Sequence, residues 1–197
     1  MGAKGVLIVT SPSQMWVGPQ PACRFVFHEM REVRSLDSIV LCNFTGRKLN
    51  LGLDVEVIDM ERSWAGPPFM PAVYQGVLDK KFGETVLCCH ACTPLVPAAA
   101  MEKCVEAVLG GKVAAQTVVK TEVALQSEAD HWEFKIGATP VLGARAFRAS
   151  QVSAWDKFGT SIYGEFEAVP VTKKQGLSLL DEGDLELIQA LEHSGRI

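Results

Sequence analysis

Apolar residues follow two alternating patterns along the chain, short continuous runs and helical stripes. Continuous runs at residues 5–10, 38–42 and 85–89 predict strands buried within a parallel sheet. Residues 54–59 alternate between polar and apolar types, which predicts a more exposed strand. Stripes with i, i+3, i+4 and i+7 spacing predict three helices, over residues 23–33, 70–78 and 97–109. This alternation of strands and helices is typical of an α/β fold with helices on both faces of the sheet.

The pattern changes after Gly111. Residues 113–121 and 131–136 predict a strand pair, and residues 166–171 predict a further strand. Residues 181–192 predict a final helix, with Asp181 as its N-cap and Asp184 three residues later, close to a capping box. With 197 residues and no internal repeat, the chain is expected to form a single domain, residues 1–197.

Charge and composition exclude several function classes. The net charge is -4, and no stripe of Lys and Arg could neutralise a phosphate backbone, so no nucleic-acid partner is expected. No run of about 18 apolar residues predicts a membrane span, and the start of the chain lacks a signal-peptide pattern. We therefore expect a cytoplasmic protein whose six cysteines are reduced and mostly buried. A phosphate ligand would need local help from backbone amides, a few basic side chains or a metal ion.

Ligands of open α/β sheets lie at the carboxyl ends of the strands, which singles out three segments of the chain. They are the loop after Thr10, residues 90–94, and the part of the C-terminal region that folds over them. Ser11 and Ser13 belong to a loop that could offer backbone amides to an anion. A tight surface turn is the favoured alternative for that loop.

The cysteines at residues 88, 89 and 92 surround His90 and raise the question of a metal site. Successive side chains of a strand point to opposite faces, so the pattern favours buried strand cysteines over a structural metal. A nucleophile and base pair made of Cys92 and His90 stays open as an alternative, although no orienting acid or oxyanion hole is recognisable. The four tryptophans could stack on a base or a sugar, but core or interface packing is favoured; they are Trp16, Trp64, Trp132 and Trp155.

Three segments of the chain resemble, in their order and spacing, the sequence landmarks of a known family. They are Val-Leu-Cys-Cys-His-Ala-Cys-Thr-Pro-Leu at 86–95, Val-Leu-Gly-Ala-Arg-Ala-Phe at 141–147, and Gly-Leu-Ser-Leu-Leu-Asp-Glu-Gly-Asp-Leu-Glu-Leu at 176–187. The first resembles a strand that ends in Gln-Pro-Thr-Ser-Pro-Leu or Asp-x-Pro-Leu, the second an Asn-Gly-Ala-x-Tyr segment, and the third a closing Asp-Ile-Asp-Thr-x-x-Asp-Leu. All three are landmarks of the nucleotide-sugar cytidylyltransferases, the family that makes CMP-sialic acid and CMP-Kdo. The resemblance covers roughly residues 38–192.

The resemblance implies a nucleotidyltransferase-like fold and transfer of a nucleotidyl group from CTP to an acidic sugar, with Mg²⁺ as cofactor and release of pyrophosphate. It also implies a homodimer, formed here by a small segment at about 144–164, which contains several apolar residues. The candidate nucleotide-binding residues are Thr10, Ser11, Ser13, Cys92 and Thr93. The candidate sugar-pocket residues are His90, Leu142, Gly143 and Ala144.

The chain departs from that family at the residues that carry charge. The family's first loop is rich in Gly, Arg and Lys, whereas residues 11–21 hold one Gly and no basic residue. The family's metal-holding Asp positions fall on Ser178 and Leu180, which leaves Asp181 and Asp184 as the metal candidates. For that acidic pair, capping of the last helix is the favoured alternative. Two functions therefore stay open, a remodelled cytidylyltransferase and a catalytically inactive relative that binds a ligand or a protein.

Overall fold

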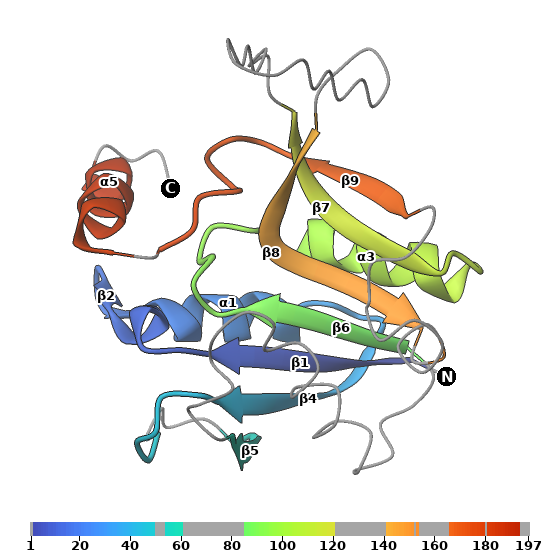
Figure 1. The fold of residues 1–197 in the computed structure, drawn as a ribbon, viewed down its shortest axis with the longest axis horizontal. Helices are drawn as coiled ribbons and strands as arrows, with labels where there is room; N and C mark the ends of the chain where they lie inside the picture. The colour runs from blue at the N-terminus through green and yellow to red at the C-terminus, as the bar shows by residue number, and fades with distance from the viewer. Residues whose placement is uncertain are drawn as a thin grey trace, which may run out of the picture.

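A seven-stranded sheet runs through the molecule in the order β5-β4-β1-β6-β8-β7-β9 (Figure 1). The computed structural model describes residues 2–49, 54–60, 85–120, 141–151, 153, 166–179 and 181–193. Strand pairing is parallel except at β8, which runs antiparallel to both β6 and β7. The predicted α/β fold with a mixed, mainly parallel sheet is therefore confirmed. The strands are β1 (Ala3–Val9), β4 (Leu36–Asn43), β5 (Glu56–Asp59), β6 (Thr85–His90), β7 (Ala114–Lys120), β8 (Val141–Gln151) and β9 (Glu167–Val171).

The central strand β1 lies between β4 and β6, with Val6 opposite Val40 on one side and Cys88 on the other. Five consecutive residues of β1, from 5 to 9, are buried, as are the last four of β4. Such continuous burial requires the unbroken apolar runs seen in the sequence, because both faces of the strand are covered. The three strands begin and end within three residues of the predicted bounds.

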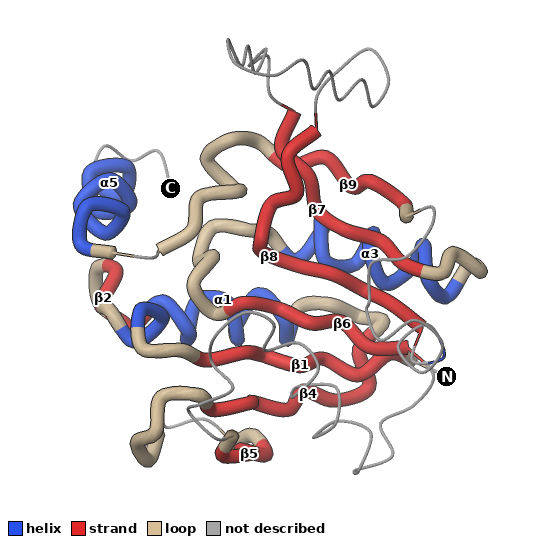
Figure 2. The backbone as a smooth tube through the Cα atoms, viewed as in Figure 1, coloured by secondary structure: helices blue, strands red, loops and turns tan. Residues whose placement is uncertain are grey.

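Helices α1 (Ala22–Arg31) and α3 (Ala98–Leu109) lie side by side on one face of the sheet, behind it in Figures 1 and 2. Their apolar stripes share one core with β1 and β6. A Cβ at Gly5 would lie 2.7 Å from Cε of Met30 on α1, so a larger residue there would displace the end of the Met30 side chain. The predicted helix at 70–78 and strand at 131–136 lie outside the described residues. Among the described helices, none is long and apolar enough to cross a membrane.

Two carboxylates join α1, α3 and the start of β4. Glu29 of α1 accepts the backbone N–H of Ala98, at 2.6 Å, in the first turn of α3. Glu102 of α3 accepts the N–H of Arg34 at 2.6 Å and the hydroxyl of Ser35, in the connection that leads to β4. The residue before α3, Pro97, has no side-chain cap, so Glu29 supplies from another helix what a local cap normally supplies.

Helix α5 (Glu182–His193) lies beside the carboxyl ends of the central strands, next to the short hairpin of β2 (Trp16–Val17) and β3 (Gln20–Pro21) (Figure 1). Ile188 of α5 packs in a small apolar cluster with Val17 and Leu179. The N–H of Asp184 donates to Oδ1 of Asp181 at 3.0 Å, which confirms the predicted N-cap.

Three features of this fold differ from the sequence analysis. The hairpin of β2 and β3 was not predicted, because two-residue strands leave no periodic signal. Strand β8 was not predicted either, since its Ala, Gly and Arg residues lack an alternating pattern; pairing with β6 on one side and β7 on the other imposes the extended backbone. Core packing is wrong for Trp16, which is 61% exposed, while the other tryptophans lie outside the described residues.

Candidate functional site

The carboxyl ends of β1 and β4 meet at one edge of the sheet, on the left in Figure 1. The loops that follow these strands form the walls of a cavity of about 310 Å³. This volume is at the lower end of the range of about 300–1,000 Å³ for small-molecule sites. The described residues that line the cavity are Ser11, Gln14, Met15, Thr45 and Arg47.

The loop after β1 is a tight turn built on Ser13. This side chain is fully buried, and its hydroxyl donates to the carbonyl of Thr10 at 2.7 Å and accepts the N–H of Thr10 at 3.1 Å. Ser13 itself lies within a short 3₁₀ helix, η1 (Pro12–Gln14). Of the candidate nucleotide-binding residues, Ser13 and Thr10 therefore shape the turn, and Ser11 lies exposed at the cavity.

The loop after β4 is organised by Asn43, which is 2% exposed. Its Nδ2 donates to Oδ1 of Asp59, at the end of β5, at 2.6 Å, and to the carbonyl of Arg47 at 2.8 Å. Its Oδ1 accepts the N–H of Thr45 at 3.1 Å and the hydroxyl of Thr45 at 2.7 Å. All four hydrogen-bonding positions of the carboxamide are thus used. A fully paired polar group of this kind holds a loop in one conformation.

Arg47 is brought to the cavity by this loop. Gly46, with φ of 69°, supplies the left-handed residue that turns the chain, and the N–H of Arg47 donates to the hydroxyl of Thr45 at 3.2 Å. The Arg47 side chain is exposed, and it is the one basic side chain among the described residues that line the cavity. Sequence reasoning missed it, because the family resemblance directed attention to the loop after β1 as the place for phosphate-binding basic residues. A Gly-Arg-Lys sequence three residues after a buried strand was the available signal.

The end of β6 forms a second turn. Thr93 is fully buried, and both its N–H, at 3.2 Å, and its hydroxyl, at 2.8 Å, donate to the carbonyl of His90. Cys92 is 8% exposed and belongs to the apolar cluster under α5, and its carbonyl accepts the N–H of Leu179 at 2.6 Å. His90 is partly buried opposite Ile8 of β1. The structure therefore places Cys92 in the cluster beside α5 and uses the hydroxyl of Thr93 within the turn, and neither residue is among the described cavity-lining residues.

The candidate sugar-pocket residues 142–144 lie on β8. Phe147 of that strand is opposite Cys89, and the antiparallel direction carries residues 142–144 past the carboxyl end of β6. There they pair with β7, Leu142 opposite Val119 and Gly143 opposite Val118. The backbone of this candidate segment is thus at the same edge of the sheet as the cavity, separated from it by β6. Its role in a sugar pocket stays a prediction.

The candidate metal residues are at the start of α5. Asp181 uses Oδ1 to cap the helix, as its N-cap position favours. Mg²⁺ prefers oxygen ligands that include a carboxylate, whereas the described cavity lining contains none, and the described residues contain no group of three His, Cys, Asp or Glu side chains placed for a metal. The described cavity lining therefore offers Mg²⁺ no carboxylate, and Asp181 and Asp184 as metal ligands stay a prediction.

All six cysteines are buried, as predicted, and the structure joins none of them in a disulfide. Burial raises the pKa of the Cys23 thiol to about 11 and that of the Cys104 thiol to about 12. Burial also raises the pKa of Cys89 well above its ordinary value, with smaller contributions from Cys88 and Cys104. These three thiols are neutral at pH 7, so they lack the thiolate character of nucleophiles and metal ligands.

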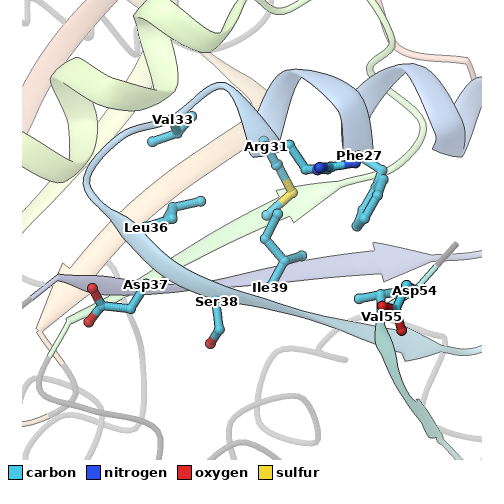
Figure 3. Close-up of a pocket in the computed structure, with 10 residues that line it drawn as sticks. Phe27, Arg31, Val33, Leu36, Asp37, Ser38, Ile39, Asp54 and Val55 are labelled. Atoms are coloured by element: carbon cyan, nitrogen blue, oxygen red, sulfur yellow. The ribbon is translucent and has the colours of Figure 1, made fainter.

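Two other cavities lie away from this edge. One, of about 220 Å³, lies between α1 and the first half of β4, where Phe27, Ile39 and Val55 form apolar walls (Figure 3). The other, of about 520 Å³, lies between the second half of α3 and the edge strand β9. Lys112 and Glu167, which form an ion pair, are among the residues that line it. Neither cavity is at the carboxyl ends of the parallel strands, so the 310 Å³ cavity is the better candidate site.

No protein-family model matches the sequence, and no curated protein matches it. Solved structures do match over almost the whole chain. A CMP:2-keto-3-deoxy-manno-octonic acid synthetase complexed with CTP superposes with a TM-score of 0.75 and 8% identity, covering 99% of this chain and 100% of the other. The chain has the cytidylyltransferase fold.

Two further cytidylyltransferases support this assignment of the fold. The 4-diphosphocytidyl-2C-methyl-D-erythritol synthase from Anaerococcus prevotii matches with a TM-score of 0.70 and 12% identity, covering 98% of this chain and 96% of its own. The 2-C-methyl-D-erythritol 4-phosphate cytidylyltransferase from Thermus thermophilus matches with a TM-score of 0.69 and 15% identity, covering 98% and 100%. At such identities the likeness establishes the cytidylyltransferase fold, while the function must be argued from the site.

Proposed function

We propose that the chain binds CTP in the 310 Å³ cavity and transfers its cytidylyl group to an acidic sugar. The observation that carries the proposal is the position of the cavity. In a cytidylyltransferase fold, the carboxyl ends of β1 and β4 hold a cavity whose described lining includes one basic side chain, and hydrogen bonds of the buried residues Ser13 and Asn43 fix its two loops. Ligands of open α/β sheets occupy this same edge.

The proposed reaction is an in-line displacement. A hydroxyl oxygen of the sugar forms a bond to the α-phosphorus of CTP, the bond from that phosphorus to the pyrophosphate oxygen breaks, and the hydroxyl proton goes to solvent. The chain contributes positioning and charge, which dominate catalysis of such transfers. In this assignment Arg47 neutralises phosphate charge, and the hydroxyl of Ser11 donates from the opposite loop. Mg²⁺ stays a prediction, and we assign it no step because the described lining offers it no carboxylate.

A catalytically inactive relative is the second candidate function. The same cavity would then bind a nucleotide or another ligand without transfer. The observation that favours it is the composition of the site, since Asp181 caps α5 and the described lining holds a single basic side chain. A homodimer also stays a prediction, because most side chains of the expected dimer segment, residues 144–164, lie outside the described part of the structure.

The two candidates are separated by measuring binding and turnover on the same protein. Purified protein is titrated with CTP, with and without Mg²⁺, in a thermal-shift experiment, and pyrophosphate is then assayed with sialic acid or Kdo as acceptor. Transfer predicts a higher melting temperature with CTP and release of pyrophosphate that needs the acidic sugar. Binding of CTP without pyrophosphate release would support the inactive relative, and no shift with CTP, UTP, ATP or GTP would refute the transferase.

A further inference from the structure

The candidate site poses an electrostatic problem. The protein carries a net charge of -4, and a triphosphate brings several further negative charges. The loop after β1, residues 11–21, contains no basic residue that could compensate them. A positive charge must therefore reach the cavity from another part of the chain, and among the described lining residues Arg47 supplies it.

We propose that Arg47 anchors the phosphate groups of the ligand and that Asn43 is the positioning residue that holds Arg47 in place. This inference rests on the proposed function, since it assigns the phosphate-binding residue of that same cavity. It places the anchoring cation on the loop after β4, whereas the serine hydroxyl comes from the loop after β1.

Arg47 suits this task chemically. A guanidinium group presents N–H donors in a planar fork, which matches two oxygens of a phosphate in a bidentate contact. The described residues of the cavity wall include no carboxylate that would compete with a phosphate for the guanidinium. Ser11 lies in the same wall, exposed and on the neighbouring loop, so the two loops offer a cation and a hydroxyl to one ligand.

The hydrogen bonds of Asn43 explain how an exposed arginine can keep its place. Nδ2 of the carboxamide donates to the carbonyl of Arg47 at 2.8 Å. Its Oδ1 accepts the N–H and the hydroxyl of Thr45, which lies two residues before Arg47. The same Nδ2 is tied to Asp59 at 2.6 Å, so the loop is fastened to the neighbouring strand β5. A loop ordered before the ligand arrives loses less entropy on binding, which raises affinity without a new contact.

The identity of residue 43 can be tested without changing its volume. In Asn43→Asp, an oxygen replaces the donor Nδ2 and faces two acceptors, Oδ1 of Asp59 and the carbonyl of Arg47. Repulsion then releases the loop at Arg47, although Arg47 itself is unchanged. Arg47→Gln makes the complementary change, because it removes the cation and leaves the backbone hydrogen bonds of the loop intact.

The experiment measures the affinities of CTP, inorganic tripolyphosphate and cytidine by isothermal titration calorimetry at several salt concentrations. Tripolyphosphate probes the phosphate subsite alone, and cytidine probes the nucleoside subsite alone. Arg47→Gln is expected to weaken CTP and tripolyphosphate about tenfold to a hundredfold, to reduce the salt dependence of both, and to leave cytidine unchanged. Arg47→Lys should retain part of the affinity, since it keeps the charge and loses the fork.

Arg34→Gln is the matched control, because Arg34 is also an exposed arginine in a loop, two residues before β4, and it is not among the described residues that line the cavity. It should leave all three affinities unchanged. Asn43→Asp should weaken tripolyphosphate more than cytidine, with circular dichroism showing that the protein is folded; if this variant does not fold, the Arg47 variants decide the proposal.

The outcomes separate this inference from the proposed function. If CTP and tripolyphosphate bind as tightly to Arg47→Gln as to the unchanged protein, Arg47 is not the anchor and the inference is overturned, while the transferase proposal survives. If both ligands depend on Arg47 but no pyrophosphate is released with an acidic sugar, the inference stands and transfer fails. If the unchanged protein binds neither CTP nor tripolyphosphate, both are overturned.

Discussion

Replacing Glu29 tests whether the contact between α1 and α3 is energetically important. Glu29 accepts the backbone N–H of Ala98 at 2.6 Å, at a helix start that has no side-chain cap of its own. In Glu29→Ala this N–H loses its partner and the first turn of α3 loses a nearby negative charge. We expect the variant to be less stable and to unfold cooperatively, since the apolar faces of both helices are unchanged.

The expected size follows from the chemistry of the contact. A hydrogen bond to a charged group contributes about 1.5–3 kcal/mol, and a negative charge at a helix N-terminus contributes about 0.3–1 kcal/mol of that total. The side chain is only partly buried, which places Glu29→Ala near the middle of the range, at about 2 kcal/mol. For a chain of this length, such a loss lowers the melting temperature by roughly 4–8 °C. Glu29→Gln keeps an acceptor and loses the charge, so it should cost about 1 kcal/mol.

Urea unfolding followed by circular dichroism measures these differences. Glu32→Ala is the control, since Glu32 is an exposed glutamate just past the end of α1, and its change should stay within about 0.5 kcal/mol. The order of stability should be unchanged protein, then Glu29→Gln, then Glu29→Ala. Equal stability of Glu29→Ala and Glu32→Ala would refute the argument that Glu29 caps α3.

Two further predictions concern α5 and the buried thiols. Asp181→Ala removes the cap of α5 and should lower the free energy of unfolding by about 1 kcal/mol while leaving the CTP affinity unchanged; an affinity loss in calorimetry with full stability would show that Asp181 holds a ligand or metal instead. The pKa of Cys104 is about 12 in the folded protein and about 9 when unfolded, so its neutral form stabilises the fold fully below pH 9 and this contribution is lost as the pH rises toward 12. Between pH 8 and 10, Cys104→Ala should therefore lose about 1 kcal/mol less stability than the unchanged protein, measured by urea unfolding under reducing conditions, and equal losses would show that Cys104 is not buried as described.

The elements that the sequence predicted are those whose own residues carry a complete signal. β1, β4 and β6 were found because strands covered on both faces need unbroken apolar runs. α1 and α3 were found because one face of each helix packs on the sheet, which leaves a stripe of 3.6-residue period. The cap of α5 by Asp181 was found because a cap and its N–H lie three residues apart.

The candidate site was predictable only in its location. The carboxyl ends of the strands pointed to the edge of the sheet that holds the 310 Å³ cavity, and Ser11 lies in its wall. Ser13 was proposed for the backbone amides of its loop and Thr93 for its place in the segment that resembles the family, yet the hydroxyls of both residues are used within turns, at Thr10 and His90. Small polar residues serve turns and ligands equally well, so residue type alone does not separate the two roles.

From the sequence alone come the α/β fold, the buried cysteines, the cap of the last helix and the edge of the sheet that holds the 310 Å³ cavity. These properties depend on residues close together in the chain, whose spacing records them directly. Only the tertiary structure brings Arg47 into the same cavity as Ser11, across 36 positions of the chain, and ties Asn43 to Asp59. The parallel pairing of β1 with β4 decides this, because it places the ends of the two strands together and makes one wall of two loops that have no pattern in common.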